Sequence, residues 1–247
     1  MRDATSPMSS NPPTAASSHP RSEEKSVDGI DLKPTSSDWV TLMESPSRRS
    51  TFDGTAGRLT GPIMARMNRD MEVAAIDELA LAQDASVLAI GFGPGVGVAE
   101  LTNRLPSGVV GGVDPSAAMV QQARRRNQSA ITDGQVTLER GMACSIPWPN
   151  GTFTGALAVN SVQLWEPLDG SIREVARILA PAGVLVAITH VWAIEKRSPL
   201  EHWVSATTEL LAGSGFRDIA HRIVRFRSGN GLVMRAEKPR SCNQNAP

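Results

Sequence analysis

A short apolar run followed by four alternating glycines constrains this chain more than any other feature. Residues Val87 to Ile90 are continuously apolar, and residues 91–97 read Gly-Phe-Gly-Pro-Gly-Val-Gly. Such a run is typical of a strand buried on both faces of a parallel sheet. Glycine permits positive φ, and free amides at a helix start can donate to a ligand. The pattern predicts a strand, a ligand-binding loop and a helix; a tight turn without a ligand is the alternative.

Strand-like and helix-like segments alternate along the rest of the chain. We expect helices over residues 62–82, 98–105, 168–179 and 200–211, and one more that opens at Pro115-Ser116 with Ser116 as its cap. We expect strands over residues 87–90, 109–113, 136–138, 156–159, 184–188, 219–226 and 231–236, the last two joined by a turn at Ser228 to Gly231. This order predicts an α/β fold with a mainly parallel sheet, whose ligands bind beyond the carboxyl ends of the strands.

Two tails flank the predicted domain, which we place at residues 56–237. The first fifty residues contain twelve Ser and six Pro, so we expect residues 1–55 to be disordered. The apolar cluster Trp39 to Met43 in that tail either docks on the domain or stays isolated. Residues 238–247 are polar, and we expect them to be flexible.

Composition excludes several classes of protein. With 25 basic and 25 acidic residues, the chain lacks the basic excess of a nucleic-acid binder, and only five Trp, five Phe and no Tyr could stack on bases. Cys144 and Cys242 have no metal-ligand spacing, so no metal is expected. No apolar run reaches membrane length and no signal-peptide core is visible in the first thirty residues. We therefore expect a cytoplasmic protein, a monomer or a homodimer, without nucleic-acid or membrane partners.

An aspartate stands where a ribose could be bound. Asp114 ends the second predicted strand, 19 residues after Gly95. A carboxylate there can accept two hydrogen bonds from a ribose diol, although helix capping is the alternative role. A dinucleotide site needs the pattern G-x-G-x-x-G. Its third glycine would fall on Val96 or Val98, so that pattern fails while G-x-G-x-G fits.

Three segments together resemble class I S-adenosylmethionine-dependent methyltransferases, and the small-molecule branch that includes the quinone-biosynthesis enzymes is the most similar. They are Val87 to Leu101, Val109 to Asn127 and Glu174 to Ile188; residues 141–153, reading GMACSIPWPNGTF, resemble the loop after strand three of that branch. The resemblance covers roughly residues 60 to 237. It implies a doubly wound, Rossmann-like sheet of seven strands, mainly parallel with an antiparallel last strand, and S-adenosylmethionine as cofactor.

The resemblance also implies a set of cofactor-binding residues. It comprises Gly91, Phe92, Gly93, Gly95, Asp114, Pro115, Met119, Met142, Ala143 and Asn160. Two positions depart from the family pattern. Ala89 stands where the family usually carries an acid that organises the loop around the methionine part of the cofactor, and Met142 stands where an acid often faces the adenine. These departures keep a non-catalytic binding or regulatory domain open, with a nicotinamide-dependent oxidoreductase as a more distant alternative.

The methyl acceptor is constrained only by exclusion. The loop from Asn160 to Trp165 lacks the [ND]-P-P-[YFW] motif of amino-methylating nucleic-acid enzymes, and no Pro-Cys nucleophile is present, so we expect a small, partly apolar molecule. His190 follows the fifth strand and is the best-placed general base, although a packing role is the favoured alternative. The stripe Met64, Met67 and Met71 either lines the acceptor pocket or packs the helix.

Overall fold

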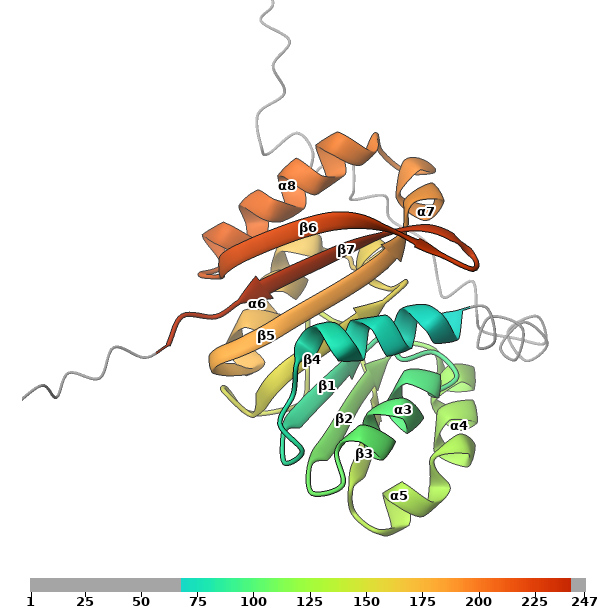
Figure 1. Ribbon diagram of the computed structural model, residues 1–247. Coiled ribbons are helices and arrows are strands. Elements are labelled where there is room, and N and C mark those ends of the chain that lie inside the picture. The colour runs from blue at the N-terminus through green and yellow to red at the C-terminus, as the bar shows by residue number, and fades with distance from the viewer. Residues whose placement is uncertain (1–67, 241–247) are drawn as a thin grey trace, which may run out of the picture. The chain divides into compact units, whose positions relative to one another are not determined.

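A computed structural model describes residues 68–240, and its centre is one sheet of seven strands (Figure 1). The strand order is β3-β2-β1-β4-β5-β7-β6. The strands are β1 Ser86–Ile90, β2 Val109–Asp114, β3 Val136–Arg140, β4 Phe153–Val159, β5 Leu179–His190, β6 Arg217–Phe226 and β7 Gly229–Glu237. All neighbours are parallel except β7, which runs antiparallel to β5 and β6. The predicted seven-stranded, Rossmann-like sheet with an antiparallel last strand is confirmed.

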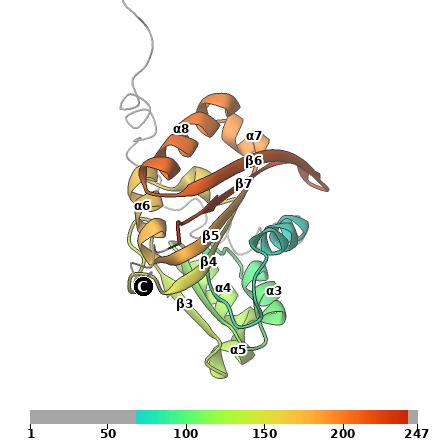
Figure 2. The ribbon, with the colours of Figure 1, turned by 60° about the vertical axis from the view of Figure 1, so that its left-hand side comes forward.

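Helices cover both faces of this sheet (Figure 2). The helix over residues 68–79 shares one face with α3 Val96–Arg104, α4 Ala117–Arg126 and α5 Gln128–Thr132; the other face carries α6 Leu168–Ile178, α7 Val191–Glu195 and α8 Leu200–Gly213. Alternate residues of β1 enter the two cores: Val87 and Ala89 pack on the first face, Leu88 and Ile90 on the second. The continuous apolar run that predicted a doubly buried strand is explained by this alternation.

The predicted helix starts and ends agree closely with the structure in most cases. Helix α3 begins at Val96 rather than Val98, and α8 ends at Gly213, two residues after the predicted end at residue 211. Ser116 caps α4 as predicted, because its side chain accepts a hydrogen bond of 3.3 Å from the backbone amide of Met119. The first predicted helix is present over residues 68–79 and ends three residues before the predicted end at residue 82, because Ala80 has a positive φ of 50°. Residues 62–67 lie outside the described part of the chain.

Predicted boundaries are also wrong at the start of β5 and at the β6–β7 turn. Strand β5 begins at Leu179, so Pro181 to Gly183 lie inside the strand instead of before it. The sheet extends there because Leu179 already pairs with Phe153 of β4. Residues after β7 also bond to this segment: the Ala182 amide donates to the Pro239 carbonyl at 3.2 Å, and the Lys238 amide donates to the Gly183 carbonyl at 2.8 Å. The β6–β7 turn consists of residues 227 and 228 rather than residues 228–231, since Phe226 already pairs with Gly229.

Several short elements escaped prediction, and some predictions cannot be compared. Helices α5 and α7 and the 3₁₀ helix η1 Val162–Leu164 have three to five residues each, too few for a readable period. The cluster Trp39 to Met43, Met64, Met67 and Cys242 lie outside the described residues. Among the described helices, none has the length and hydropathy to span a bilayer.

Candidate active site

The glycine loop closes β1 onto α3 with three residues in the left-handed region. Gly91, Gly93 and Gly95 have φ of 69°, 53° and 79°, which explains why glycine occupies each alternate position. Gly95 is the N-cap of α3 and supplies no capping side chain. No described atom lies within 4 Å of the place where a Gly93 Cβ would be, so the loop backbone is open at its centre. An open backbone at a helix start is a geometry that can receive a polar ligand.

Asp114 ties this loop to the end of β2. The Gly93 amide donates to Asp114 Oδ2 at 2.8 Å, and the Ser116 amide donates to Asp114 Oδ1 at 2.9 Å. The side chain is 6 % exposed. A carboxylate has about four acceptor positions, and these two backbone bonds use two of them. Asp114 therefore orients the loop from the end of β2.

Some of the other residues predicted to bind the cofactor are buried, and others are exposed. Phe92 and Met119 are buried, and the Phe92 ring packs beside the backbone of Gly112. Pro115 is exposed, and Met142 is 50 % exposed on the loop after β3. Ala143 next to it is partly buried against the second core. Phe92 and Met119 can thus contact a ligand only through backbone atoms or a small change in packing, whereas Met142 offers its side chain directly.

Asn160 and His190 meet where β4 and β5 end. Asn160 has φ of 52°, a conformation that Asn adopts more readily than most residues. The His190 backbone amide donates to Asn160 Oδ1 at 3.0 Å, and the His190 ring atom Nε2 lies 3.3 Å from Asn68 Oδ1. The Asn160 amide nitrogen also lies 3.6 Å from Met71 Sδ. The start of the helix over residues 68–79 therefore lies beside this end of the sheet.

His190 is buried and stacked on an exposed indole. Its side chain is 5 % exposed, and its ring lies 5.5 Å from the Trp192 ring at an interplanar angle of 24°. The Lys196 ammonium nitrogen lies over the Trp192 ring, 4.5 Å from its centroid. Burial lowers the pKa of His190, although Asp70 and the Asn230 backbone oppose that shift. A neutral imidazole at pH 7 suits a general base as well as a packing residue.

In the loop after β4, Gln163 lies at the same rim as Asn160, whereas Trp165 packs in the second core. The Gln163 side-chain amide donates to the Asn160 carbonyl at 3.0 Å. Trp165 is 7 % exposed and, together with Thr207, lines a small apolar cavity between the sheet and helices α6 and α8. No group of three or more His, Cys, Asp or Glu side chains that could hold a metal occurs within residues 68–240.

One acidic residue near the loop escaped the sequence reading. Glu72, on the helix over residues 68–79, lies so close to α3 that a Cβ on Gly97 would be 2.3 Å from its Oε2. Burial, with a smaller contribution from Glu100, raises the pKa of Glu72 to about 8. The available signal was the fourth glycine of the loop, Gly97, which lies within a helix and has no positive φ to explain it.

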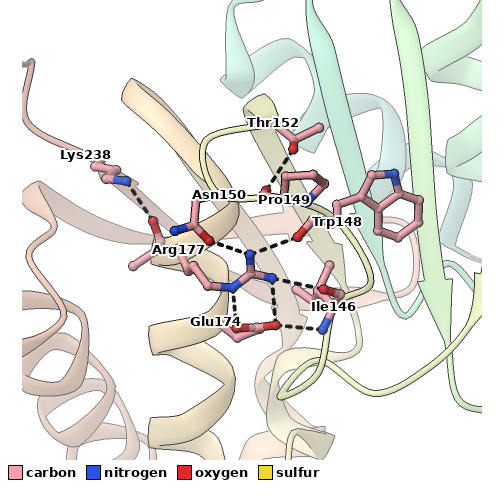
Figure 3. A network of polar contacts seen from close by, with 9 residues as sticks. Ile146, Trp148, Pro149, Asn150, Thr152, Glu174, Arg177 and Lys238 are labelled. Atoms are coloured by element: carbon pink, nitrogen blue, oxygen red, sulfur yellow. Dashed lines mark hydrogen bonds and ion pairs between the residues drawn. The ribbon is translucent and has the colours of Figure 1, made fainter.

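A polar clamp holds the loop between β3 and β4 (Figure 3). Arg177 donates from Nε to Glu174 Oε2 at 2.8 Å, and from Nη1 and Nη2 to the carbonyls of Trp148 and Ile146 at 2.8 and 3.0 Å. The Ile146 amide donates to Glu174 Oε1 at 2.8 Å. The clamp joins residues 141–153 to α6, the two segments that carry much of the family resemblance. It fixes the loop that presents Met142 and Ala143.

Comparison with known proteins agrees with this geometry. A family model described as a methyltransferase domain matches residues 87–183, from β1 through the clamp to β5. The uncharacterized methyltransferase YdaC of Bacillus subtilis is 28 % identical over 184 residues, which cover 73 % of this chain and 98 % of the relative. The matching domain and this relative support a class I S-adenosylmethionine-dependent methyltransferase.

Two further similarities cover a shorter stretch or show only a shared fold. Over 83 residues the methyltransferase is 30 % identical to the demethylmenaquinone methyltransferase of Symbiobacterium thermophilum, covering 34 % of this chain and 33 % of that one. The structure of a geranyl diphosphate methyltransferase with geranyl diphosphate and sinefungin matches with a TM-score of 0.59 and 16 % identity, over 70 % of this chain and 79 % of that one. The second similarity shows the fold alone. The quinone-biosynthesis branch stays a prediction.

The residues present fit S-adenosylmethionine as the cofactor. The open backbone at Gly93 provides the space, the α3 amides and Asp114 provide donors and acceptors, and Met142 provides a polarisable thioether. Ala89, where the family usually carries an acid, is 3 % exposed and packs in the first core. The methyltransferase therefore lacks a carboxylate at that position, and the position is filled by apolar packing.

Proposed function

We propose that this methyltransferase acts on a small, partly apolar acceptor at the carboxyl end of its sheet. The observation that carries the proposal is the hydrogen bond of 2.8 Å from the Gly93 amide to Asp114, which holds an open glycine loop beside a carboxylate. The cofactor, when bound, supplies an electrophilic methyl group on a sulfonium. The protein then needs mainly to align the acceptor and exclude water.

The proposed roles follow from position. The backbone of Gly91, Gly93 and Gly95 approaches the cofactor, with Phe92, Pro115 and Met119 around it. Asp114 accepts hydrogen bonds from the ribose, Met142 and Ala143 border the adenine, and Asn160 lies at the rim beside His190. The two relatives named for isoprenoid compounds, a demethylated menaquinone and geranyl diphosphate, support an acceptor with an apolar part.

His190 is the general base in this proposal when the acceptor must lose a proton. Its lowered pKa keeps the ring neutral near pH 7, and Asn68 restrains the ring from one side. General-base catalysis contributes roughly 10²- to 10⁴-fold to a rate. Full turnover of an acceptor hydroxyl by a His190→Asn variant would assign the residue to packing instead.

The test is calorimetric titration with S-adenosylmethionine and S-adenosylhomocysteine, with NADP as the control ligand. Asp114→Ala removes two backbone contacts and the ribose acceptor. We expect cofactor affinity to fall by ~1.5–3 kcal/mol, roughly tenfold to a hundredfold or more. Circular dichroism checks that the variant is folded. An unchanged dissociation constant would remove Asp114 from the site, and tight NADP binding would favour an oxidoreductase.

A non-catalytic binding domain is the second candidate, because Ala89 and Met142 replace two acids of the family pattern. It predicts cofactor binding without turnover on any acceptor. A screen of small phenols, quinols and carboxylic acids with methyl-labelled S-adenosylmethionine separates the two candidates. Transfer of label to any of them excludes the non-catalytic one.

A further inference from the structure

Glu72 is a carboxylate held at the glycine loop without a cation of its own. It belongs to the helix over residues 68–79, and its Oε2 occupies the space that a side chain on Gly97 would need. Gly97 lies in the first turn of α3, which contains no acidic residue and has no side-chain cap. The Glu72 carboxyl therefore lies against the first turn of α3 at Gly97, two residues beyond Gly95.

No described basic group neutralises this carboxylate. Arg69, one turn earlier on the same helix, donates to Glu100 of α3 from Nε at 2.9 Å and from Nη2 at 2.5 Å. None of the ion pairs within residues 68–240 involves Glu72. Glu100 is the charged group that acts on Glu72, and burial together with Glu100 raises the pKa of Glu72 to about 8. A carboxyl in such surroundings is disfavoured as an anion until a cation arrives.

Glu72 and Ala89 lie on the same side of the sheet. Ala89 belongs to the core formed by β1, α3 and the helix over residues 68–79, and Met71 and Ala75, which flank Glu72 on its helix, pack in the same core. The carboxylate that the family resemblance expects on β1 is absent at Ala89. A carboxylate instead reaches the loop from the neighbouring helix.

We propose that Glu72 binds the α-ammonium group of the cofactor's amino-acid portion, and so replaces the carboxylate missing at Ala89. The inference rests on the proposed function, since it requires the cofactor to lie on the glycine loop. S-adenosylmethionine and S-adenosylhomocysteine both carry this ammonium group. 5′-Methylthioadenosine shares their adenosine and thioether but has no amino-acid portion. The three ligands together isolate the contact.

The experiment titrates the full chain and its Glu72→Gln variant with the three ligands at pH 7.5. Glu72→Gln keeps the shape of the side chain and removes the charge. We expect dissociation constants for S-adenosylmethionine and S-adenosylhomocysteine to rise tenfold to a hundredfold, while that for 5′-methylthioadenosine changes less than twofold. Asp77→Asn is the matched control: it removes one exposed carboxylate from the same helix, and we expect no change for any ligand.

A proton count gives a second readout that helix support alone would not produce. At pH 7 the ligand-free Glu72 is mostly protonated, because its pKa is about 8. Binding of an ammonium group favours the anion, so close to one proton should be released. Calorimetry of S-adenosylhomocysteine binding in buffers of different ionisation enthalpy measures this number. We expect the release to be absent in Glu72→Gln.

Gly97→Ala tests the same contact from the other side. The new methyl group would meet the end of a flexible side chain rather than backbone, so the fold is retained and the Glu72 carboxyl is displaced. We expect Gly97→Ala to reproduce the ligand pattern of Glu72→Gln. Equal loss for all three ligands, loss for S-adenosylmethionine alone, or no loss would each overturn the proposal. If the folded wild type binds none of the three ligands, the proposed function itself is wrong.

Discussion

The four glycines of the loop are favoured at their positions for different physical reasons. A Cβ on Gly91 would lie 2.4 Å from Ser161 Cβ, and one on Gly95 would lie 2.7 Å from Ala123 Cβ, so both allow close packing of neighbouring elements. Gly97 makes room for Glu72. Among these four glycines, Gly93 alone has no described atom within 4 Å of its Cβ position, and we propose that this position faces the cofactor. A motif that resembles a single ligand signature therefore also serves packing at three of its four glycines.

This difference predicts opposite outcomes for two alanine substitutions. The new methyl group of Gly93→Ala meets no described atom, so the variant should lose only about 1–2 kcal/mol of unfolding free energy from the left-handed φ of an alanine. The same variant should nevertheless weaken cofactor binding at least tenfold. Gly95→Ala adds a clash with the backbone of Ala123 and should cost more than 3 kcal/mol. Urea unfolding and calorimetric titration measure the two effects. Equal stabilities of the two variants would contradict the assignment.

At the scale of elements, the clamp of Glu174 and Arg177 explains why two distant segments share the resemblance. Arg177 reaches two carbonyls of the β3–β4 loop and also the Asn150 side chain, with a distance of 2.8 Å to Asn150 Oδ1. A planar guanidinium can make these bonds at once, whereas a lysine ammonium cannot match their directions. The clamp acts on the loop that presents Met142, so it supports the proposed adenine side of the site.

Arg177→Lys should therefore destabilise the protein by about 2–3 kcal/mol. The matched control is Arg173→Lys on the same helix, whose exposed pair with Asp169 should contribute less than about 0.5 kcal/mol. Urea unfolding at pH 7 compares the variants. Hydrogen exchange should show faster opening of residues 141–152 in Arg177→Lys only. Identical behaviour of the two variants would mean that the clamp adds nothing.

The same clamp has a defined pH dependence. Hydrogen bonds from Arg177 lower the pKa of Glu174 below its usual value of 4.5. The native state therefore gains stability from Glu174 above the pKa of the unfolded chain and loses it as the pH falls through the lowered native pKa. The difference in unfolding free energy between wild type and Arg177→Lys should accordingly narrow on acidification.

At the scale of the whole molecule, Glu72 lowers the stability of the ligand-free protein at neutral and alkaline pH, while in our proposal it strengthens cofactor binding. Its native pKa of about 8 exceeds the usual carboxyl value of 4.5, so the folded state holds its proton more tightly than the unfolded chain does. Below the pKa of Glu72 in the unfolded chain, this group does not reduce the free energy of unfolding. Above that pKa the reduction grows until the pH passes about 8. Disfavoured groups of this kind are retained where binding needs them.

Glu72→Gln should consequently raise stability while it weakens cofactor binding. We expect the ligand-free variant to exceed the wild type by about 2–4 kcal/mol of unfolding free energy at pH 8.5, since each pKa unit corresponds to ~1.4 kcal/mol. The two proteins should be nearly equal at pH 5. Urea unfolding at both pH values measures the difference. A variant that is less stable than wild type at pH 8.5 would assign Glu72 to helix support.

The sequence by itself determined the order of elements, the strand–loop–helix unit at Val87 to Arg104, the capping by Ser116 and the place of Asp114. These are local properties: apolar runs, glycine at positive φ and a capping hydroxyl act within a few residues of one another. Boundaries that depend on distant partners were misread. Strand β5 begins at Leu179 because this residue pairs with Phe153 of β4, a partner that is distant in the sequence.

Only the tertiary structure decided which side chains share the site. Glu72 and Gly97 are 25 positions apart in the sequence, and Asn68 and His190 are 122 apart, yet each pair is in contact. No periodicity records such contacts, because they arise where a helix packs across strands that are neighbours only in the folded sheet. The loop reads as a binding motif from its residues, whereas the charge placed beside it depends on the packing of one helix against another.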